Sequence, residues 1–327
     1  MERSVIVTGG AGFIGSHTCK RLAQQGFHPV VLDNLITGHK ENVRWGPLVE
    51  GDIRNKSLVA TTLDIYKPVA VIHFAGSAYV GESVLKPEKY YLNNVVGSLQ
   101  LLECCVEAGV KNFIFSSSCA TYGIPQRLPV DEKCEQYPTN PYGRTKLIVE
   151  SALKDFSGAH DLNFVSLRYF NAAGADPDGD LFENHDPETH LIPRALLAAA
   201  GHIPVLQVFG NDYETADGTC IRDYIHVCDL ADGHISALEY LISGGRNLAI
   251  NLGAGRGISV KQILHAVESI TGCKVPVSIV QRRPGDPPEL YANTELASTS
   301  LGFKTKFSNI ETIIGTAAPN FGFGGNR

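Results

Sequence analysis

The sequence lacks long apolar runs and clusters of positive charge, and each absence excludes a class of protein. No apolar run approaches the roughly 20 residues needed to cross a bilayer, so we expect no membrane partner. The first predicted strand begins at Ser4, which leaves no room for a signal peptide, and we expect a cytoplasmic protein. The 34 acidic residues outnumber the 28 basic ones, for a formal charge of −6. Without a basic run we expect no nucleic-acid partner.

Patterns of paired cysteines and of metal-binding histidines are also missing. The eight cysteines form no Cys-x-x-Cys pair, and the adjacent Cys104 and Cys105 are poorly placed to bond with each other. We expect reduced and mostly buried thiols. The eleven histidines show no His-x-x-x-His or similar ligand spacing, so we expect no metal site. Apolar residues make up 43% of the 327, enough to form the core of one large domain or two unequal ones.

The first apolar stretch, Val5 to Thr8, runs directly into a set of regularly spaced glycines. Gly9 permits a tight turn, Gly12 lets the backbone approach a pyrophosphate, and Gly15 lets the next helix pack close to the strand. The N-terminus of that helix attracts phosphate, although the glycine pattern alone also fits an ordinary strand-to-helix turn. Asp33 ends a second apolar run about 20 residues later, where its carboxylate would bind ribose hydroxyls and favour NAD over NADP.

Up to about residue 170, short apolar strands alternate with longer helical patterns, which predicts an α/β fold with a doubly wound parallel sheet of the Rossmann type. Strands are expected at Val5 to Thr8, Val30 to Leu32, Leu48 to Glu50, Val69 to Phe74, Asn112 to Ser116 and Phe164 to Leu167. Helices are expected at Ile14 to Gln25, Lys56 to Tyr66, Pro87 to Ala108, Pro141 to Phe156, Leu191 to Ala200, Val227 to Leu241 and Val260 to Thr271. We expect a NAD-binding domain over 1–170 and a smaller mixed α/β substrate domain over 171–327, with some exchange of strands between them.

Three polar residues are candidates for proton transfer. Tyr142 and Lys146 are four residues apart and therefore lie on one face of a predicted helix. A neighbouring cation and a positively charged nicotinamide favour the phenolate, so we expect a lowered pKa for Tyr142 and a role as base. Ser118 follows a predicted strand, where its hydroxyl can bind the reacting hydroxyl beside Tyr142. The same residues also fit an exposed tyrosine and lysine on a surface helix and an ordinary polar strand end.

These residues and several later motifs resemble the extended short-chain dehydrogenase/reductase family, and within it the UDP-glucose 4-epimerases. The resemblance covers nearly the whole chain. The segments that carry it beside the glycine turn are Val71-Ile72-His73-Phe74-Ala75-Gly76, Val80-Gly81-Glu82-Ser83, Tyr90-Tyr91-Leu92-Asn93-Asn94, Leu167-Arg168-Tyr169-Phe170-Asn171, Arg222-Asp223-Tyr224-Ile225-His226-Val227 and Arg282-Arg283-Pro284-Gly285-Asp286.

The resemblance implies a bound NAD and a catalytic set of Ser118, Tyr142 and Lys146. It implies cofactor contacts in the glycine turn and at the strand ends, from Gly9, Gly12, Phe13, Ile14, Gly15, Asp33, Asn34, Leu35, Ile36, Thr37, Gly38, Asp52, Ile53, Phe74, Ala75, Gly76, Ser77, Ala78, Asn93, Ser116, Tyr142, Lys146, Tyr169 and Phe170. It implies contacts with the UDP-sugar from Ser118, Tyr142, Asn171, Leu191, Gln207, Phe209, Arg222, Arg283, Asp286 and Leu290. The arginines would supply charge-assisted hydrogen bonds to phosphate.

The implied activity is the interconversion of UDP-glucose and UDP-galactose through a transient 4-keto sugar. One alternative is another NAD-dependent 4-epimerase, acting on UDP-N-acetylhexosamines or UDP-pentoses. A nucleotide-sugar dehydratase or decarboxylase is a second alternative, but Cys119-Ala120 stand where dehydratases of this type carry an Asp-Glu pair. A NAD-binding protein without activity is a third, and it would not need the set of Ser118, Tyr142 and Lys146.

Two positions depart from the family pattern. Ala78 replaces a lysine near the cofactor, and Thr189-His190 replace an Asn-Asn pair before Leu191. The family also pairs two helices, which match 87–108 and 141–156, across a two-fold axis, so the resemblance implies a homodimer. Leu99, Leu102 and Val106 are candidates for its interface, and packing on their own sheet explains them equally well.

Overall fold

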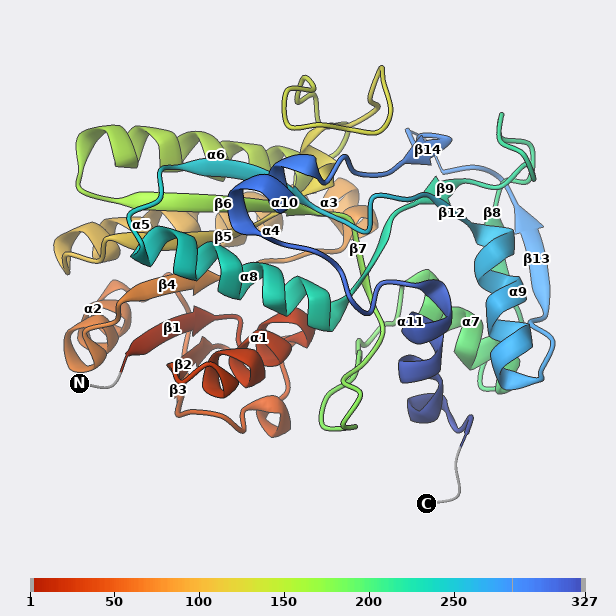
Figure 1. Ribbon diagram of the computed structural model, residues 1–327, viewed down its shortest axis with the longest axis horizontal. Helices are drawn as coiled ribbons and strands as arrows, with labels where there is room; N and C mark the ends of the chain where they lie inside the picture. Colours follow the sequence, from red (N-terminus) through yellow and green to blue (C-terminus); the bar gives the residue numbers. More distant parts are fainter. Residues whose placement is uncertain (1–2, 284, 325–327) are drawn as a thin grey trace.

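The computed structural model describes residues 3–283 and 285–324. Its centre is a seven-stranded sheet in the order β11-β6-β5-β4-β1-β2-β3, and each neighbouring pair of strands is parallel (Figure 1). The strands are β1 (Ser4–Thr8), β2 (His28–Asp33), β3 (Leu48–Glu50), β4 (Ala70–His73), β5 (Asn112–Ser118), β6 (Asn163–Tyr169) and β11 (Leu248–Leu252). The order reverses between β1 and β4, which makes a crevice for ligands at their carboxyl ends. The predicted fold class is confirmed.

Helices cover both faces of the sheet because side chains alternate along each strand. On β1, Val5 and Val7 belong to one apolar cluster and Ile6 to the other. The helices of the first face are α1 (Phe13–Gln24) and α8 (Val227–Ile242), and those of the second are α2 (Lys56–Tyr66), α5 (Gly97–Glu107) and α6 (Pro141–Ala159). The glycine turn after β1 and the catalytic candidate Ser118 at the end of β5 therefore belong to one continuous sheet.

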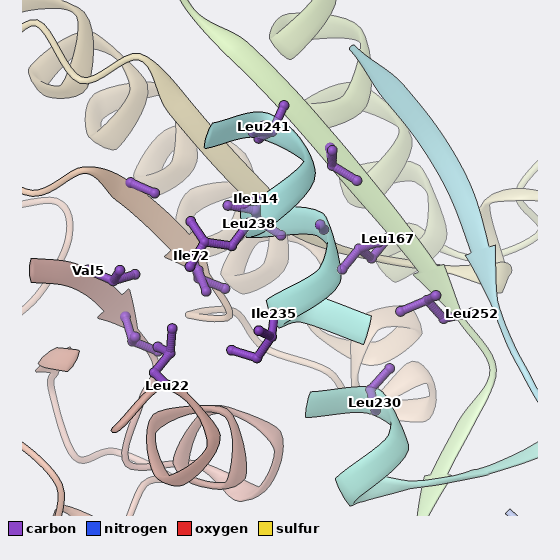
Figure 2. Close-up of a cluster of buried hydrophobic side chains, with 14 of the residues drawn as sticks. Val5, Leu22, Ile72, Ile114, Leu167, Leu230, Ile235, Leu238, Leu241 and Leu252 are labelled. Atoms are coloured by element: carbon purple, nitrogen blue, oxygen red, sulfur yellow. The ribbon is translucent and has the colours of Figure 1, made fainter. Parts of the chain in front are cut away.

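Figure 2 shows how the two halves of the chain share the first apolar cluster. Leu22 of α1 and Ile235 and Leu238 of α8 gather over Ile72 and Ile114 of the sheet. The second half of the chain contributes β11 as well, which pairs with β6 along its whole length. The N-terminal sheet thus depends on a helix and a strand from beyond residue 170.

The remaining elements of the second half form a smaller region with its own apolar cluster (Figure 1). They are β7 (Asn171–Ala173), α7 (Leu191–Ala199), β8 (Leu206–Phe209), β9 (Ile221–Arg222), β10 (Tyr224–His226), β12 (Ile258–Ser259), α9 (Val260–Thr271), β13 (Val277–Val280), β14 (Glu289–Leu290), α11 (Ile310–Ala317) and a 3₁₀ turn, η4 (Ala318–Phe321). One further helix, α10 (Glu295–Leu301), packs instead on β11 and α8, in the first apolar cluster. Short pairs join them: β10 with β7, β13 with β8, and β9 with both β12 and β14. Within residues 3–283 and 285–324, no helix is long and apolar enough to cross a membrane.

The helix expected at Pro87 to Ala108 is interrupted. The structure has α3 (Val80–Leu85), α4 (Pro87–Tyr90), a π-helical segment η2 (Tyr91–Val96) and then α5. A π-helical turn inserts a residue into the helical ladder and often marks a functional position. The side chains of Asn93 and Asn94, within this segment, turn to bind the loop after β4. Two further 3₁₀ turns are η1 (Lys40–Asn42) and η3 (Cys119–Thr121).

Candidate active site

The glycine turn after β1 has the geometry that its sequence predicts. Gly9 adopts a left-handed conformation with φ of 72°, where a Cβ would lie 2.6 Å from the backbone nitrogen of Ala75. A Cβ on Gly15 would lie 2.3 Å from the carbonyl oxygen of Gly9, so α1 packs directly on the turn. Gly12 is the N-cap of α1, and no acidic residue lies in the helix's first turn. The positive end of α1 is therefore open to an anion.

Asp33, the last residue of β2, is fixed by the neighbouring backbone. Its two carboxylate oxygens accept hydrogen bonds from the amides of Ala11 (3.0 Å) and Leu35 (2.9 Å), while burial raises its pKa. Gly38 lies over the same carboxylate, since a Cβ there would be 3.0 Å from both oxygens. Each oxygen keeps a free lone pair for a further donor. In the rest of this turn, the Asn34 side chain accepts from the amide of Ile36 at 3.2 Å, and Ile36 and Thr37 are exposed.

Asp52 follows β3 and lies next to the same turn. It accepts a hydrogen bond from Asn34 at 3.2 Å and pairs with Arg54 at 2.7 Å. The hydrogen bonds from Arg54 are the main cause that lowers the pKa of Asp52 to about 2. Ile53 is buried in the second apolar cluster. The structure therefore brings the carboxyl ends of β1, β2 and β3 together around one set of loops.

The loop after β4 is tied to the helix that carries Tyr142. The amide of Ser77 donates to the Asn94 side chain at 2.8 Å, and Asn94 in turn donates to the Thr145 hydroxyl of α6 at 3.2 Å. Asn93 donates to the Ser77 hydroxyl at 3.3 Å. Ala78, which replaces the family's lysine, is exposed at the end of this loop. Asn94 is a positioning residue that the sequence analysis did not single out, although it stands in the motif of Asn93.

Ser118 and Tyr142 meet at the carboxyl end of β5. Ser118 ends the strand, and its hydroxyl accepts from the amide of Ala120 at 3.1 Å. Tyr142 lies in the first turn of α6, which starts at a fixed point because Asn140 caps it by accepting from Gly143 at 2.8 Å. Burial raises the pKa of Tyr142 to about 12, and a hydrogen bond with Ser118 opposes this. The lowered pKa expected beside a positively charged nicotinamide stays a prediction.

Lys146 is buried one turn after Tyr142. Its ammonium donates to the Ser116 carbonyl at 2.6 Å and lies 5.7 Å from the centre of the Tyr142 ring. Burial lowers the pKa of Lys146 to about 8, partly opposed by the charge of Glu150. The Ser116 hydroxyl is hydrogen-bonded to the Tyr169 hydroxyl. The three catalytic candidates therefore lie together at the carboxyl end of β5.

The residues expected to hold the nucleotide lie in the second half, in two small groups. Arg222 on β9 forms an ion pair with Asp286, and Leu290 on β14 is paired in register with Arg222. The guanidinium of Arg283 lies 3.9 Å from the centre of the Phe209 ring. Three more predicted contacts lie on other elements: Asn171 on β7, Leu191 at the start of α7, and Gln207 on the same face of β8 as Phe209. Pro284 lies outside the described residues.

Asp223 is a second residue that the sequence analysis did not assign. Its buried carboxylate accepts from the amides of Ala254 (2.8 Å), Gly255 (3.1 Å) and Ala292 (3.1 Å), and burial raises its pKa to about 6. The backbone carbonyl of Asp223 also accepts from the Asn171 side chain at 2.9 Å. Asp223 thereby joins three segments behind the nucleotide residues, and its place in the Arg222 motif was the available signal.

The chain resembles known proteins over most of its length. The profile of the NAD dependent epimerase/dehydratase family matches residues 5–253. A UDP-glucose 4-epimerase of Rhizobium leguminosarum bv. trifolii is 53% identical over 310 residues, which are 95% of each chain. The crystal structure of a UDP-glucose 4-epimerase from Brucella ovis in complex with NAD is 60% identical, with a TM-score of 0.97 over 98% of this chain and 99% of that one.

A more distant solved structure extends the same likeness to the nucleotide. It is a UDP-glucose 4-epimerase from Bifidobacterium longum in complex with NAD+ and UDP, 37% identical with a TM-score of 0.92 over 96% of this chain and 97% of that one. The family profile covers most of the chain, and the relatives match it over nearly its full length. The geometry of the glycine turn and of Tyr142 agrees with this likeness. The chain belongs to the NAD dependent epimerase/dehydratase family.

Proposed function

We propose that this chain is a UDP-glucose 4-epimerase, an isomerase that interconverts UDP-glucose and UDP-galactose with a tightly bound NAD. The observation that carries the proposal is the convergence of Ser118, Tyr142 and Lys146 beside a glycine turn built for a dinucleotide. The full-length relatives named UDP-glucose 4-epimerase support it.

The residues of the first half fit NAD. The open N-terminus of α1 suits the pyrophosphate, and the free lone pairs of Asp33 suit the two ribose hydroxyls of the adenosine. When bound, NAD supplies an acceptor for the hydride from C4 of the sugar and returns the same hydride. Its positive nicotinamide ring also offsets the burial that raises the pKa of Tyr142.

We propose that Tyr142 moves the proton. Its phenol oxygen would take the proton of the sugar's 4-hydroxyl, with Ser118 hydrogen-bonded to the same hydroxyl and Lys146 favouring the phenolate. Arg222 and Arg283 would hold the diphosphate by charge while the 4-keto sugar turns to present its other face. Once the hydride has returned to the opposite face of C4, Tyr142 would give the proton back to the 4-oxygen. Configuration at C4 inverts, with no net oxidation.

The residue after Ser118 argues against a dehydratase. Water loss needs an acid and a base there, but burial raises the pKa of Cys119 to about 12, and Ala120 carries no titratable group. Neither side chain can exchange a proton near neutral pH. The epimerase proposal therefore fits the chemistry of this position better.

We also propose that the two halves of the chain bind different ligands. Residues 1–170 would hold NAD and residues 171–327 the UDP-sugar, with β11 and α8 of the second half completing the NAD-binding sheet. A cytoplasmic location stays a prediction from the sequence.

The surface of α3, α4 and η2 supports a homodimer. It exposes a group of large apolar side chains, namely Val80, Val84, Leu85, Leu92 and Val96. Such a patch marks an interaction site, and the family pairs helices of this region across a two-fold axis. Leu102 is fully buried in the second apolar cluster and is removed from the expected interface, because it covers its own sheet. We propose that a second copy of the chain covers this patch.

One assay tests the activity. Purified protein is incubated with UDP-galactose, UDP-N-acetylgalactosamine and UDP-xylose in separate reactions without added cofactor, and the products are identified by chromatography. We expect UDP-glucose from UDP-galactose, and release of NAD when the protein is denatured. A protein that yields a dehydrated sugar, or that turns over only with stoichiometric external NAD, would contradict the proposal.

A further inference from the structure

A compact group of two imidazoles and two carboxylates lies in the segment before α7. Glu183, His185, Glu188 and His190 each direct one ligand atom into it, and these four atoms all lie within 4.8 Å of one another. We propose that this group binds one divalent cation of the zinc type. None of these four residues belongs to the proton-transfer set of Ser118, Tyr142 and Lys146, so the two sites are made of different residues.

The distances within the group match those between ligands that share a cation. The Nδ1 atom of His185 lies 3.3 Å from a carboxylate oxygen of Glu183 and 3.6 Å from one of Glu188. Ligand atoms of a tetrahedral zinc site lie roughly 3.3 Å apart, since each bond to the metal is about 2.0–2.2 Å long. The Nδ1 atom of His190 also contacts the Glu183 carboxylate. The four atoms therefore lie close enough together to share one cation.

The bonding of His185 is incomplete without a ligand. Its Nδ1 atom is buried, yet among the described residues it has no hydrogen-bond partner, although two carboxylates are near. A buried polar atom without a partner costs stability unless something else satisfies it. A cation held in common by His185, Glu183 and Glu188 would satisfy all three at once.

The charge of the group also favours a cation. The side chain of Glu183 is only 4% exposed and that of Glu188 is 12% exposed, so two carboxylates are held close together in a poorly solvated place. The local field therefore stabilises positive charge, and a dication with two neutral imidazoles would neutralise both carboxylates.

The donor atoms select the kind of metal. Imidazole nitrogen with carboxylate oxygen in a four-coordinate group suits zinc, whereas magnesium and calcium prefer six or more oxygen ligands. Four protein ligands leave no open position for a substrate, so the site would be structural. The ligands follow a Glu-x-His-x-x-Glu-x-His pattern in an irregular loop, which differs from the His-x-x-x-His spacing of a helical metal site.

The loop that carries the four ligands lies against the dinucleotide turn, so a metal there would have a structural role. His185 packs edge-on against Phe13, the first residue of α1, and against Tyr79, the residue before α3. The backbone carbonyl of Asn184 accepts from His39 at 2.9 Å. A cation would fix the segment that runs from β7 to α7 against the dinucleotide turn. It would thus stabilise the contact between the two halves of the chain next to the cofactor.

Metal content of the full-length protein tests the proposal. The protein is produced without a histidine tag in zinc-supplemented medium, dialysed extensively, and measured by inductively coupled plasma mass spectrometry. We expect about one zinc per chain in the wild type, an unchanged content in His160→Ala, whose imidazole is exposed on α6's C-terminal side, and a loss of most of it in the double variant His185→Ala/His190→Ala. A wild type without zinc, or a double variant with as much zinc, would overturn the proposal.

Cobalt substitution and thermal unfolding give readouts that do not depend on activity. Co²⁺ bound to the chelator-treated protein should show the visible absorption of a tetrahedral site, and Glu188→Gln should weaken its binding at least tenfold if Glu188 is a ligand. Chelation should lower the melting temperature of the wild type but leave that of the double variant unchanged. An equal melting-temperature change in both proteins, or cobalt absorption that survives in the double variant, would show that these residues do not hold the metal.

Discussion

Glu150 of α6 and Arg168 of β6 form an ion pair in which both side chains are almost completely buried, 1% and 3% exposed, at 2.6 Å. The Ser117 hydroxyl donates to the same carboxylate at 2.5 Å, and Arg168 donates to the Tyr122 hydroxyl at 2.9 Å. Glu150 is one turn beyond Lys146, and Ser117 precedes Ser118. The pair therefore fixes the helix that carries the proposed base to the strand end that carries Ser118.

We expect Arg168→Met to lower the free energy of unfolding strongly, because it leaves the Glu150 carboxylate buried without its partner. Breaking a buried pair in this way typically costs about 3–5 kcal/mol. The measurement is urea denaturation of the NAD-bound protein, followed by circular dichroism. Lys111→Ala removes an exposed pair with Asp161 and serves as a control, for which we expect no measurable change. Similar stabilities for the two variants would show that the buried pair is not structurally important.

Tyr142→Phe should lower kcat by roughly 10²- to 10⁴-fold while binding of UDP stays close to that of the wild type. The substitution removes the proton acceptor but leaves Arg222 and Arg283 unchanged. Steady-state kinetics with UDP-galactose and calorimetry with UDP separate the two effects. Turnover close to that of the wild type would exclude Tyr142 as the base.

Lys146→Met should change the pH dependence of kcat as well as its size. The pKa of Lys146 is lowered to about 8, so near pH 7 it is mostly charged and favours the phenolate, and this help is lost as the pH rises through that value. Without Lys146, the fraction of phenolate depends on pH alone and should grow about tenfold per pH unit, as for any base well below its pKa. We expect kcat of the variant to be low near neutral pH and to recover in alkaline buffer. An identical pH profile for the two proteins would contradict the role.

The sequence was sufficient to predict the parallel strands β1 to β6, although not their order, because each is a short apolar run. Helical patterns follow β1, β3, β4 and β5, and the glycines at 9, 12 and 15 mark the expected dinucleotide turn. β11 was not predicted, because its pairing with β6 joins residues that are far apart in sequence and lie in differently patterned halves of the chain.

The catalytic candidates could be predicted as separate residues, but their connections could not. Asn94 reaches Thr145, and Glu150 reaches Arg168, only after the chain has folded, and each side chain by itself looks like an ordinary polar surface residue. The burial that raises the pKa of Tyr142 depends on packing, which the spacing of Tyr142 and Lys146 does not reveal.

The proposed dimer predicts that Leu85→Glu weakens self-association. Leu85 is 82% exposed at the end of α3, so the folded monomer gains little from its side chain, whereas a charged residue there would be costly to bury against a second copy. Light scattering over a range of protein concentrations should show a dimer for the wild type and a shift toward monomer for the variant. Ile270→Glu, on the exposed side of α9, is the matched control and should leave the dimer intact. A wild-type monomer at micromolar concentration would contradict the proposal.

Leu290 is expected to determine how well the site accepts a bulky group at C2 of the sugar. It is buried in a small cluster with Tyr122 and Phe170, and Cys119, the residue after Ser118, packs against the same cluster. The neighbouring Tyr291 does not fill this space, because its ring lies against Gly257, where a Cβ would be 3.1 Å from it. Leucine is shorter than tyrosine, and it should leave part of the volume that an N-acetyl group requires.

We therefore predict measurable epimerisation of UDP-N-acetylglucosamine by the wild type, slower than that of UDP-glucose, and a further loss in Leu290→Tyr. Steric differences of this kind are typically worth about 1–3 kcal/mol, so the ratio of kcat/KM for the two substrates should change by roughly 10- to 200-fold. Leu290→Met conserves the volume and is the control, for which the ratio should stay near that of the wild type. Because UDP-glucose lacks the N-acetyl group, its kcat/KM should change far less in either variant. A ratio that the tyrosine leaves unchanged would show that the C2 substituent lies elsewhere.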